Sequence, residues 1–291
     1  MTLIVAKGLP AASELAGEGI VFAEDLPRCS SYLTILILNL MPTKTDTERQ
    51  LLRLLGQSGV AIQVDFIHLT SPESKNVSKE HLSRYYTDFS KIKGKTYDGL
   101  IITGAPVEHL PFEDVNYYDE LKEILEWSRT HVSQRLFICW AAQFALNQLF
   151  KVNKLSLNEK LFGVFDYHIS NQNHPFTNGF QATYSVPQSR HTSIAEEDIR
   201  KIAELDLLSR HPNFGPDIIA TKDKNDLFVF GHLEYESDTL QKEYKRDLSK
   251  GESIKQPKNS QVTDTAPHQQ AWKNASQLLW FNWIQYIYQM K

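Results

Sequence analysis

The chain has 291 residues, of which 41% are hydrophobic and 23% charged, which is typical of a soluble globular protein long enough for one large domain. Its net charge of −4 comes from interspersed acidic and basic residues, so we expect neither a nucleic-acid partner nor an anionic membrane surface. Two cysteines, Cys29 and Cys139, do not make a disulfide framework, and the longest apolar stretch, 278–288, is too short and too polar to span a bilayer. No secretory signal opens the chain, so we expect a cytoplasmic protein.

Apolar runs bounded by turn residues predict strands in the first half of the chain, over 33–40, 60–69, 97–106 and 135–139. Helical periodicity predicts helices over 45–56, 115–132 and 141–150. Thr45 and Glu48 have the spacing of a capping box, and Gly56 stops the first helix. Strands that alternate with helices predict βαβ units, and therefore an α/β fold with a doubly wound, mostly parallel sheet and flanking helices.

The second half of the chain continues with predicted strands over 160–169 and 228–235. A helix follows over 237–251, with Ser237 as its N-cap and Gly251 as its stop. The polar stretch 252–268 has no periodicity and is predicted to be a loop, and 269–291 is predicted to be a C-terminal amphipathic helix. We expect all of residues 1–291 to form a single domain with this C-terminal extension.

Cys139 lies between a predicted strand and a predicted helix. This is the carboxyl end of the strand, where the active-site residues of parallel sheets usually lie. A helix N-terminus or a nearby imidazole lowers the pKa of a thiol, so Cys139 is a candidate nucleophile. The glycines that usually flank such a strand-to-helix turn are absent. Free cysteine is also common in protein cores, so this residue alone leaves both interpretations open.

The sequence "GHLEY" supplies a candidate base. His232 and Glu234 are two residues apart, so on extended backbone both side chains point to the same side. The carboxylate could then hold the imidazole in one tautomer, as a Cys–His–Glu system requires. The alternative is an exposed polar pair at a strand end. His232 and Glu234 alone do not complete the coordination sphere of a zinc ion, so we expect no metal.

Taken together, these motifs resemble the homoserine O-acyltransferases of the MetA family, whose fold is similar to the flavodoxin-like class I glutamine amidotransferases. The resemblance covers most of the chain and rests on "LILNLMPTKTDTERQLLRLLG", "YDGLIITGAP", "LEWSRTHV", "LFICWAAQFALN", "EKLFGVFDYHI" and "GHLEYESDTLQKEYKRDL". It implies that Cys139 takes an acyl group from acyl-coenzyme A, with His232 as base and Glu234 orienting it. A ping-pong cycle in methionine or cysteine biosynthesis follows, with no cofactor besides the acyl-CoA substrate.

The resemblance also implies where the amino-acid acceptor binds. The four side chains that bind it would be those of Lys160, Ser189, Glu243 and Arg246. The backbone N–H groups of Trp140 and Leu54 would face the thioester oxygen. By residue type alone, Lys160 is equally an exposed lysine, and Glu243 with Arg246 equally a surface ion pair at i,i+3 spacing.

The residue after "TGAPV" indicates the acyl donor, because the family carries there either a small residue, associated with succinyl transfer, or a glutamate, associated with acetyl transfer. This chain has Glu108. A carboxylate fills the space that a succinyl tail needs and repels its terminal charge. We therefore predict acetyl-CoA, with succinyl-CoA as the alternative donor.

The acceptor is less firmly indicated. The family's "GHPEY" is "GHLEY" here, and its "NYFP" segment is replaced by "ESIKQPKNSQVTD". The resemblance favours L-homoserine, which we predict as the acceptor; L-serine stays the alternative, since one methylene changes binding by only ~1–3 kcal/mol. A glutaminase that serves a synthetase partner and a non-catalytic ligand-binding module are further alternatives. A homodimer is common for such folds.

Overall fold

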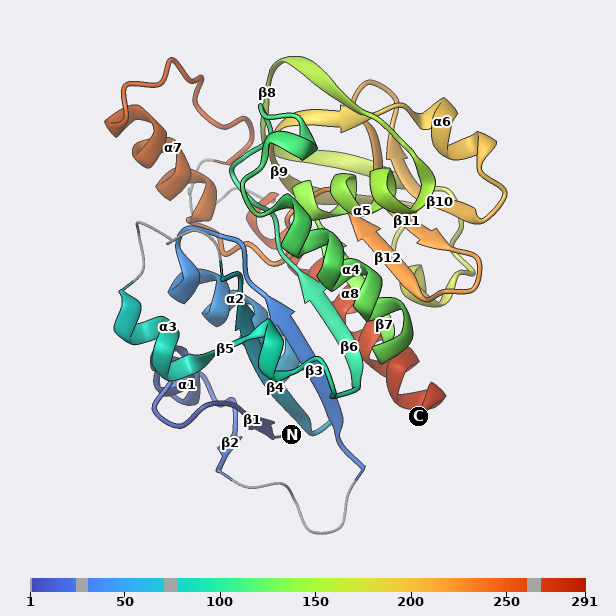
Figure 1. Cartoon of the computed structure of the whole chain (residues 1–291). Helices are drawn as coiled ribbons and strands as arrows, with labels where there is room; N and C mark the ends of the chain where they lie inside the picture. Colours follow the sequence, from blue (N-terminus) through green and yellow to red (C-terminus); the bar gives the residue numbers. More distant parts are fainter. Residues whose placement is uncertain (1, 25–30, 71–77, 261–267) are drawn as a thin grey trace.

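The computed structural model describes residues 2–24, 31–70, 78–260 and 268–291, and one mixed sheet runs through them (Figure 1). Its parallel half contains, in spatial order, β2 (Phe22–Ala23), β1 (Leu3–Ile4), β4 (Ile62–His68), β3 (Leu33–Leu38), β6 (Tyr97–Ile102), β7 (Val132–Ile138) and β12 (Asp226–Val229), with β5 (Tyr86–Asp88) beside β4. Its antiparallel half continues from β12 through β11 (Gly215–Thr221), β10 (Leu205–His211), β8 (Lys154–Ile169) and β9 (Thr183–Ile194).

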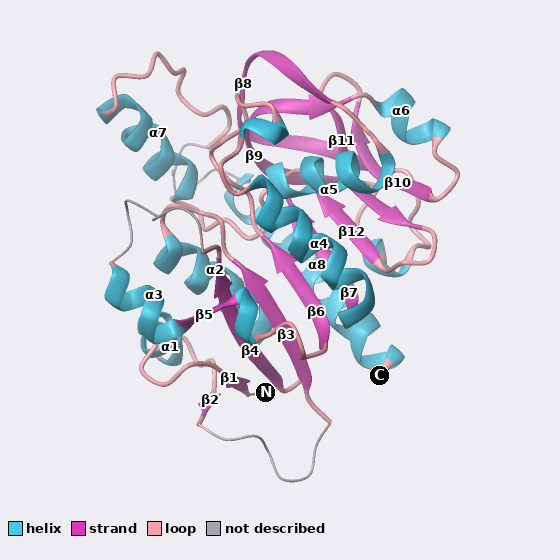
Figure 2. Cartoon of the chain, in the orientation of Figure 1, coloured by secondary structure: helices cyan, strands magenta, loops and turns pink. Residues whose placement is uncertain are grey.

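Helices cover both faces of the sheet (Figure 2). One face is covered by α1 (Pro10–Ala16), α2 (Lys44–Gly56) and α8 (His268–Met290). The other is covered by α4 (Tyr118–His131), α5 (Trp140–Phe150) and the short α6 (Glu196–Lys201). The remaining helices are α3 (Lys79–Tyr85), α7 (Thr239–Ser249), η1 (Phe89–Lys91), η2 (Phe112–Asp114) and η3 (Pro175–Thr177). Among the described residues, no helix is both long and apolar enough to cross a membrane.

Two hydrophobic cores, one on each face, explain why the central strands have continuous apolar sequences. In β3, Ile35 and Ile37 contribute to the core under α2 and α8, whereas Leu36 and Leu38 contribute to the core under α4 and α5. Consecutive side chains of a strand point to opposite faces, so a strand covered on both sides needs an apolar residue at every position. This burial confirms the α/β class that the sequence predicts.

Most predicted elements are present, with shifted ends. The predicted capping box is wrong: α2 begins at Lys44 after Thr43, and the buried Glu48 accepts a hydrogen bond from the Tyr86 hydroxyl (2.6 Å). The N-cap of α7 is Asp238 and not Ser237, while Gly251 has the positive φ of 80° expected of a helix stop.

The largest correction concerns the second half of the chain. The predicted strand 228–235 ends at Val229, so His232 lies in a turn and not on a strand. The antiparallel strands β9, β10 and β11 have no counterpart among the predicted elements. Residues 252–260 form the expected loop, apart from one bridge between Lys258 and Gly163, but 261–267 and Cys29 lie outside the described residues.

A buried ion pair fixes the register between β7 and β12. Arg135 and Asp226 are directly opposite residues of these parallel strands, and the guanidinium contacts both carboxylate oxygens at 2.6 and 2.8 Å. Both side chains are less than one-tenth exposed. Burial raises the pKa of Asp226, and the charge of Arg135 opposes that shift. The ionised carboxylate therefore depends on its partner.

We expect Arg135→Ala to lower the free energy of unfolding, measured by urea denaturation, by about 3–5 kcal/mol, because it leaves a buried carboxylate without a partner. The exposed pair of Arg129 with Glu126 provides the control, and Arg129→Ala should cost only ~0–1 kcal/mol. Combining Arg135→Met with Asp226→Leu should recover most of the loss. Equal effects of the two single variants would contradict a structural role for the buried pair.

Candidate active site

A small cavity of about 170 Å³ lies where the parallel strands end. Each of four neighbouring strands contributes a residue from the segment that follows it: Met41 after β3, Gly104 after β6, Cys139 after β7 and His232 after β12. The carboxyl ends of adjacent parallel strands meet at one edge of a sheet, so these residues come together although they are far apart in sequence.

Cys139 occupies a sharp turn between β7 and α5. Its φ of 53° and ψ of −113° are uncommon for a residue with a side chain, and such conformations cost roughly 1–3 kcal/mol. Its backbone N–H donates to the carbonyl of Val229 (2.7 Å), and its carbonyl accepts from Ala142 (3.1 Å). Strand pairing on one side and the first turn of α5 on the other therefore hold the strained turn without flanking glycines.

His232 links Cys139 to a carboxylate. Its Nδ1 lies 2.7 Å from Oε1 of Glu234, which leaves Nε2 for its hydrogen bond with Cys139. Burial lowers the pKa of His232, but Glu234 and Cys139 raise it by more, so the net pKa lies well above the usual range. A protonated imidazole beside a sulfur atom is an arrangement that stabilises a thiolate nucleophile. The ring of Tyr235 stacks on the imidazole at 4.2 Å.

The turn that carries His232 is anchored to the antiparallel half of the sheet. The N–H of Gly231 donates to Oδ1 of Asp217 (2.7 Å), and the N–H of His232 donates to the carbonyl of Pro187 (2.8 Å). Only glycine fits at 231, since a Cβ there would lie 2.3 Å from Val186 and 2.7 Å from the same Asp217 oxygen. Asp217 was not among the residues predicted from the sequence, although a charged residue inside the apolar run "GPDIIA" was an available signal.

The predicted acceptor residues all border the same cavity. Lys160 is largely buried, and its Nζ lies 3.0 Å from Oδ2 of Asp247, whose Oδ1 accepts from Nε of Arg246 (2.7 Å). Glu243 is also buried and accepts a hydrogen bond from the Tyr235 hydroxyl (2.7 Å). The alternatives of an exposed lysine and a surface Glu243–Arg246 pair are therefore wrong. Asp247, which bridges Lys160 and Arg246, was not among the residues predicted from the sequence.

Of two further predicted residues, Glu108 lines the cavity, and Trp140 directly follows Cys139, which lines it. Glu108 accepts hydrogen bonds from the backbone N–H groups of His191 (2.6 Å) and Thr192 (3.2 Å). Trp140 is the first residue of α5, so its N–H belongs to the first turn and has no carbonyl four residues back within the helix. That N–H follows Cys139 directly.

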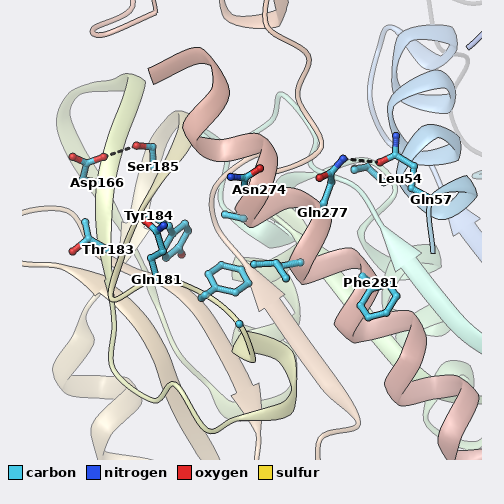
Figure 3. Close-up of a pocket in the computed structure, with 14 residues that line it drawn as sticks. Leu54, Gln57, Asp166, Gln181, Thr183, Tyr184, Ser185, Asn274, Gln277 and Phe281 are labelled. Atoms are coloured by element: carbon cyan, nitrogen blue, oxygen red, sulfur yellow. Dashed lines mark hydrogen bonds between the residues drawn. The ribbon is translucent and has the colours of Figure 1, made fainter. Parts of the chain in front are cut away.

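Leu54 is not part of this site, which corrects the expectation that its N–H faces the thioester oxygen. It lies well inside α2, where backbone N–H groups bond to the preceding turn. Its side chain lines a separate groove of about 830 Å³ between α2, α8 and β9 (Figure 3). The loop after β6 approaches the nucleophile instead, since a Cβ on Gly104 would lie 3.3 Å from Cβ of Cys139 and 3.8 Å from Cε1 of His232.

Comparison with known proteins gives one consistent family. The family described as homoserine O-succinyltransferase matches residues 2–291. The chain is 43% identical to homoserine O-acetyltransferase 1 of Ilyobacter polytropus, over 99% of this chain and 98% of that one. It is 44% identical to the homoserine O-acetyltransferase of Clostridium novyi, with coverage of 99% and 98%.

Among solved structures, a glutamine amidotransferase from Methylobacillus flagellatus superposes with a TM-score of 0.60 at 9% identity, over 88% of this chain and 95% of that one. At this identity the similarity concerns the fold alone, and it confirms the expected amidotransferase-like architecture.

We expect Gly104→Ala to slow alkylation of Cys139 by iodoacetamide about tenfold, equivalent to ~1.4 kcal/mol, because the added methyl group crowds the sulfur and the imidazole. Peptide mass spectrometry separates Cys139 from Cys29. Gly94→Ala is the control, since a Cβ there meets nothing within 4 Å. Alkylation at the wild-type rate in Gly104→Ala would show that Gly104 does not limit access to the sulfur.

Proposed function

Because the chain belongs to the homoserine O-succinyltransferase family, we propose that it transfers an acetyl group from acetyl-CoA to the side-chain hydroxyl of L-homoserine, in methionine biosynthesis. The observation that carries this proposal is the buried Cys139–His232–Glu234 chain, which shares one cavity with Glu108 and the acceptor residues. The relatives named above, which are acetyltransferases, support the acetyl donor.

The first half-reaction loads the enzyme. The Cys139 sulfur attacks the thioester carbonyl of acetyl-CoA, and the N–H of Trp140 at the start of α5 stabilises the developing oxyanion. The tetrahedral intermediate collapses as the carbon–sulfur bond to CoA breaks, and protonated His232 supplies the proton that CoA takes away. The product is an acetyl thioester on Cys139 and a neutral imidazole.

The second half-reaction transfers the acetyl group. His232 accepts the proton of the acceptor hydroxyl, whose oxygen attacks the thioester, and the carbon–sulfur bond to Cys139 breaks. Glu234 fixes the ring through Nδ1, so that Nε2 accepts the proton. The ester leaves and the imidazole is protonated again, which closes a ping-pong cycle.

Charges in the cavity suit an α-amino acid. Arg246 presents a guanidinium that matches a carboxylate, and Asp247 holds it in place from one side. Oε2 of Glu243 is buried and has no hydrogen-bond partner among the described residues, which suits an ammonium group. We therefore assign the acceptor's carboxylate to Arg246 and its ammonium to Glu243, with Lys160 and Ser189 beside them.

L-Homoserine remains our preferred acceptor over L-serine. The departure from the family pattern in "GHLEY" is Leu233, whose side chain is 2% exposed and packs in the core instead of lining the cavity. It therefore gives no reason to prefer the shorter acceptor. We also propose a cytoplasmic enzyme, because a reactive thiol needs a reducing compartment, and a homodimer, the commonest oligomer of soluble proteins.

Incubation with acetyl-CoA and no acceptor should add one acetyl group to Cys139, detected by intact mass spectrometry. Cys139→Ala should abolish the adduct and Cys29→Ala should retain it. L-Homoserine should then discharge the thioester at least tenfold faster than L-serine. A faster discharge by serine would change the acceptor and leave the mechanism intact, whereas labelling that persists in Cys139→Ala would refute the acyl-enzyme.

Arg246→Lys should raise the KM for homoserine roughly tenfold or more, because an ammonium cannot form the paired hydrogen bonds of a guanidinium with a carboxylate. The rate of Cys139 acetylation, measured without acceptor, should change little. Lys245→Ala removes a neighbouring exposed cation of α7 and should leave the KM unchanged. The assignment fails if Arg246→Lys slows acetylation as much as it weakens acceptor use.

A further inference from the structure

Tyr235 contacts both the imidazole of His232 and the acceptor residue Glu243. Its ring stacks on the imidazole, with 4.2 Å between the ring centroids and 19° between the ring planes. Its hydroxyl donates a hydrogen bond of 2.7 Å to Oε1 of Glu243. The side chain is buried and lines the same cavity as Cys139. One aromatic side chain therefore joins the base of the proposed reaction to a group that we assign to the acceptor.

The backbone fixes Tyr235 relative to the imidazole. Its N–H donates to the carbonyl of His232 (3.1 Å), which closes the turn between the two residues. Its own carbonyl accepts a hydrogen bond from the indole of Trp272 in α8 (3.1 Å). Because both polar groups of its backbone are bonded, Tyr235 cannot shift away from His232 without breaking the turn.

The hydroxyl of Tyr235 divides the carboxylate of Glu243 into a bonded and an open oxygen. Burial raises the pKa of Tyr235 well above its usual value, and the charges of Glu243 and Glu234 raise it further, so the hydroxyl keeps its proton and donates. The bond occupies Oε1 and leaves Oε2 for a cation. Glu243 also borders a second cavity of about 170 Å³ between α2 and α7, so the carboxylate would have room to turn if the hydroxyl were removed.

We propose that Tyr235 is a positioning residue for the reaction, with two separable functions. Its ring holds the protonated imidazole of His232 beside Cys139. Its hydroxyl fixes the carboxylate of Glu243, so that the ammonium group of the acceptor binds at one defined oxygen. This inference rests on the proposed acyl transfer to an α-amino acid.

Each function acts on a different half-reaction. The face of an aromatic ring attracts a cation, so the stacked ring favours the imidazolium and, with it, the thiolate of Cys139. A fixed position for the ammonium group sets the distance from the acceptor hydroxyl to the thioester. L-Homoserine and L-serine differ in that distance by one methylene. A carboxylate that could turn would follow the shorter acceptor and reduce the discrimination between the two.

Tyr235→Phe removes the hydroxyl and keeps the ring. It should raise the KM for L-homoserine severalfold and bring the rates at which homoserine and serine discharge the thioester closer together by a similar factor. Acetylation of Cys139, measured without acceptor, should keep its wild-type rate because the stack is retained. Tyr97→Phe is the matched control, since it removes a hydroxyl that donates to Asp65 (2.9 Å) away from the cavity. An unchanged KM in Tyr235→Phe would overturn the function of the hydroxyl.

A double-mutant cycle tests whether the hydroxyl acts through Glu243. Glu243→Gln should raise the KM for homoserine by itself. Adding Tyr235→Phe to that variant should then have little further effect, because the carboxylate that the hydroxyl fixes is already gone. Full additivity of the two effects would show that Tyr235 acts on the acceptor by another route, and would overturn this assignment.

Tyr235→Leu and Tyr235→Met remove the ring, and the use of two variants guards against a folding defect in either. In both, the ultraviolet absorbance of the thiolate at neutral pH, measured against Cys139→Ala, should fall at least twofold. Acetylation should slow about tenfold, equivalent to ~1.4 kcal/mol. Tyr235→Phe should retain both values. A wild-type thiolate signal in the aliphatic variants would overturn the function of the ring. Failure of the proposed function itself would show differently, as the absence of an acetyl thioester on Cys139 in the wild-type protein.

Discussion

The parallel pairing of β12 with β7 is the constraint on which the rest of the structure depends. Arg135 and Asp226 set its register at one end, and the hydrogen bond from the Cys139 N–H to the Val229 carbonyl continues it at the other. Cys139 and His232 leave the sheet from these two strands, although all of β8 to β11 separates them in sequence. A shift of one residue in this pairing would move the imidazole away from the sulfur, and no local adjustment of the turn would restore the contact.

The elements of the fold that can be predicted from the sequence are those that a local sequence pattern determines. Strands buried on both faces, such as β3, need an apolar residue at every position, and this need is visible in the sequence. The catalytic candidates were found because their residue types and positions at strand ends suggested chemistry. Asp217 and Asp247 were missed because their roles depend on partners, Gly231 and Lys160, that only the folded chain brings near. Leu54 was misplaced because its role came from the family resemblance alone, whereas a backbone N–H inside α2 bonds to the preceding turn of the helix.

The polar groups of the site are arranged before any substrate arrives. Glu234 is bound to His232, Asp247 to Lys160 and Arg246, and Glu108 to backbone N–H groups of β9. Each carboxylate therefore has a fixed partner, which limits the reorganisation that charge development requires during reaction. Glu243 differs, since one of its oxygens has a partner in Tyr235 and the other has none among the described residues. Oε2 of Glu243 is thus an unpaired hydrogen-bond acceptor, and it lies where we propose that the amino-acid substrate binds.

The hydrogen bonds that α8 makes to the catalytic turn bear on how the protein folds. The Ser276 hydroxyl donates to the carbonyl of Leu233, and the Trp272 indole donates to the carbonyl of Tyr235 (3.1 Å). The turn with His232 and Glu234 is thus completed by an element that follows it in the chain. A chain with only the parallel strands assembled would lack these two hydrogen bonds to the turn. The Cys139–His232–Glu234 arrangement is therefore complete only in the fully folded chain, although Cys139 itself directly follows a strand of the parallel half.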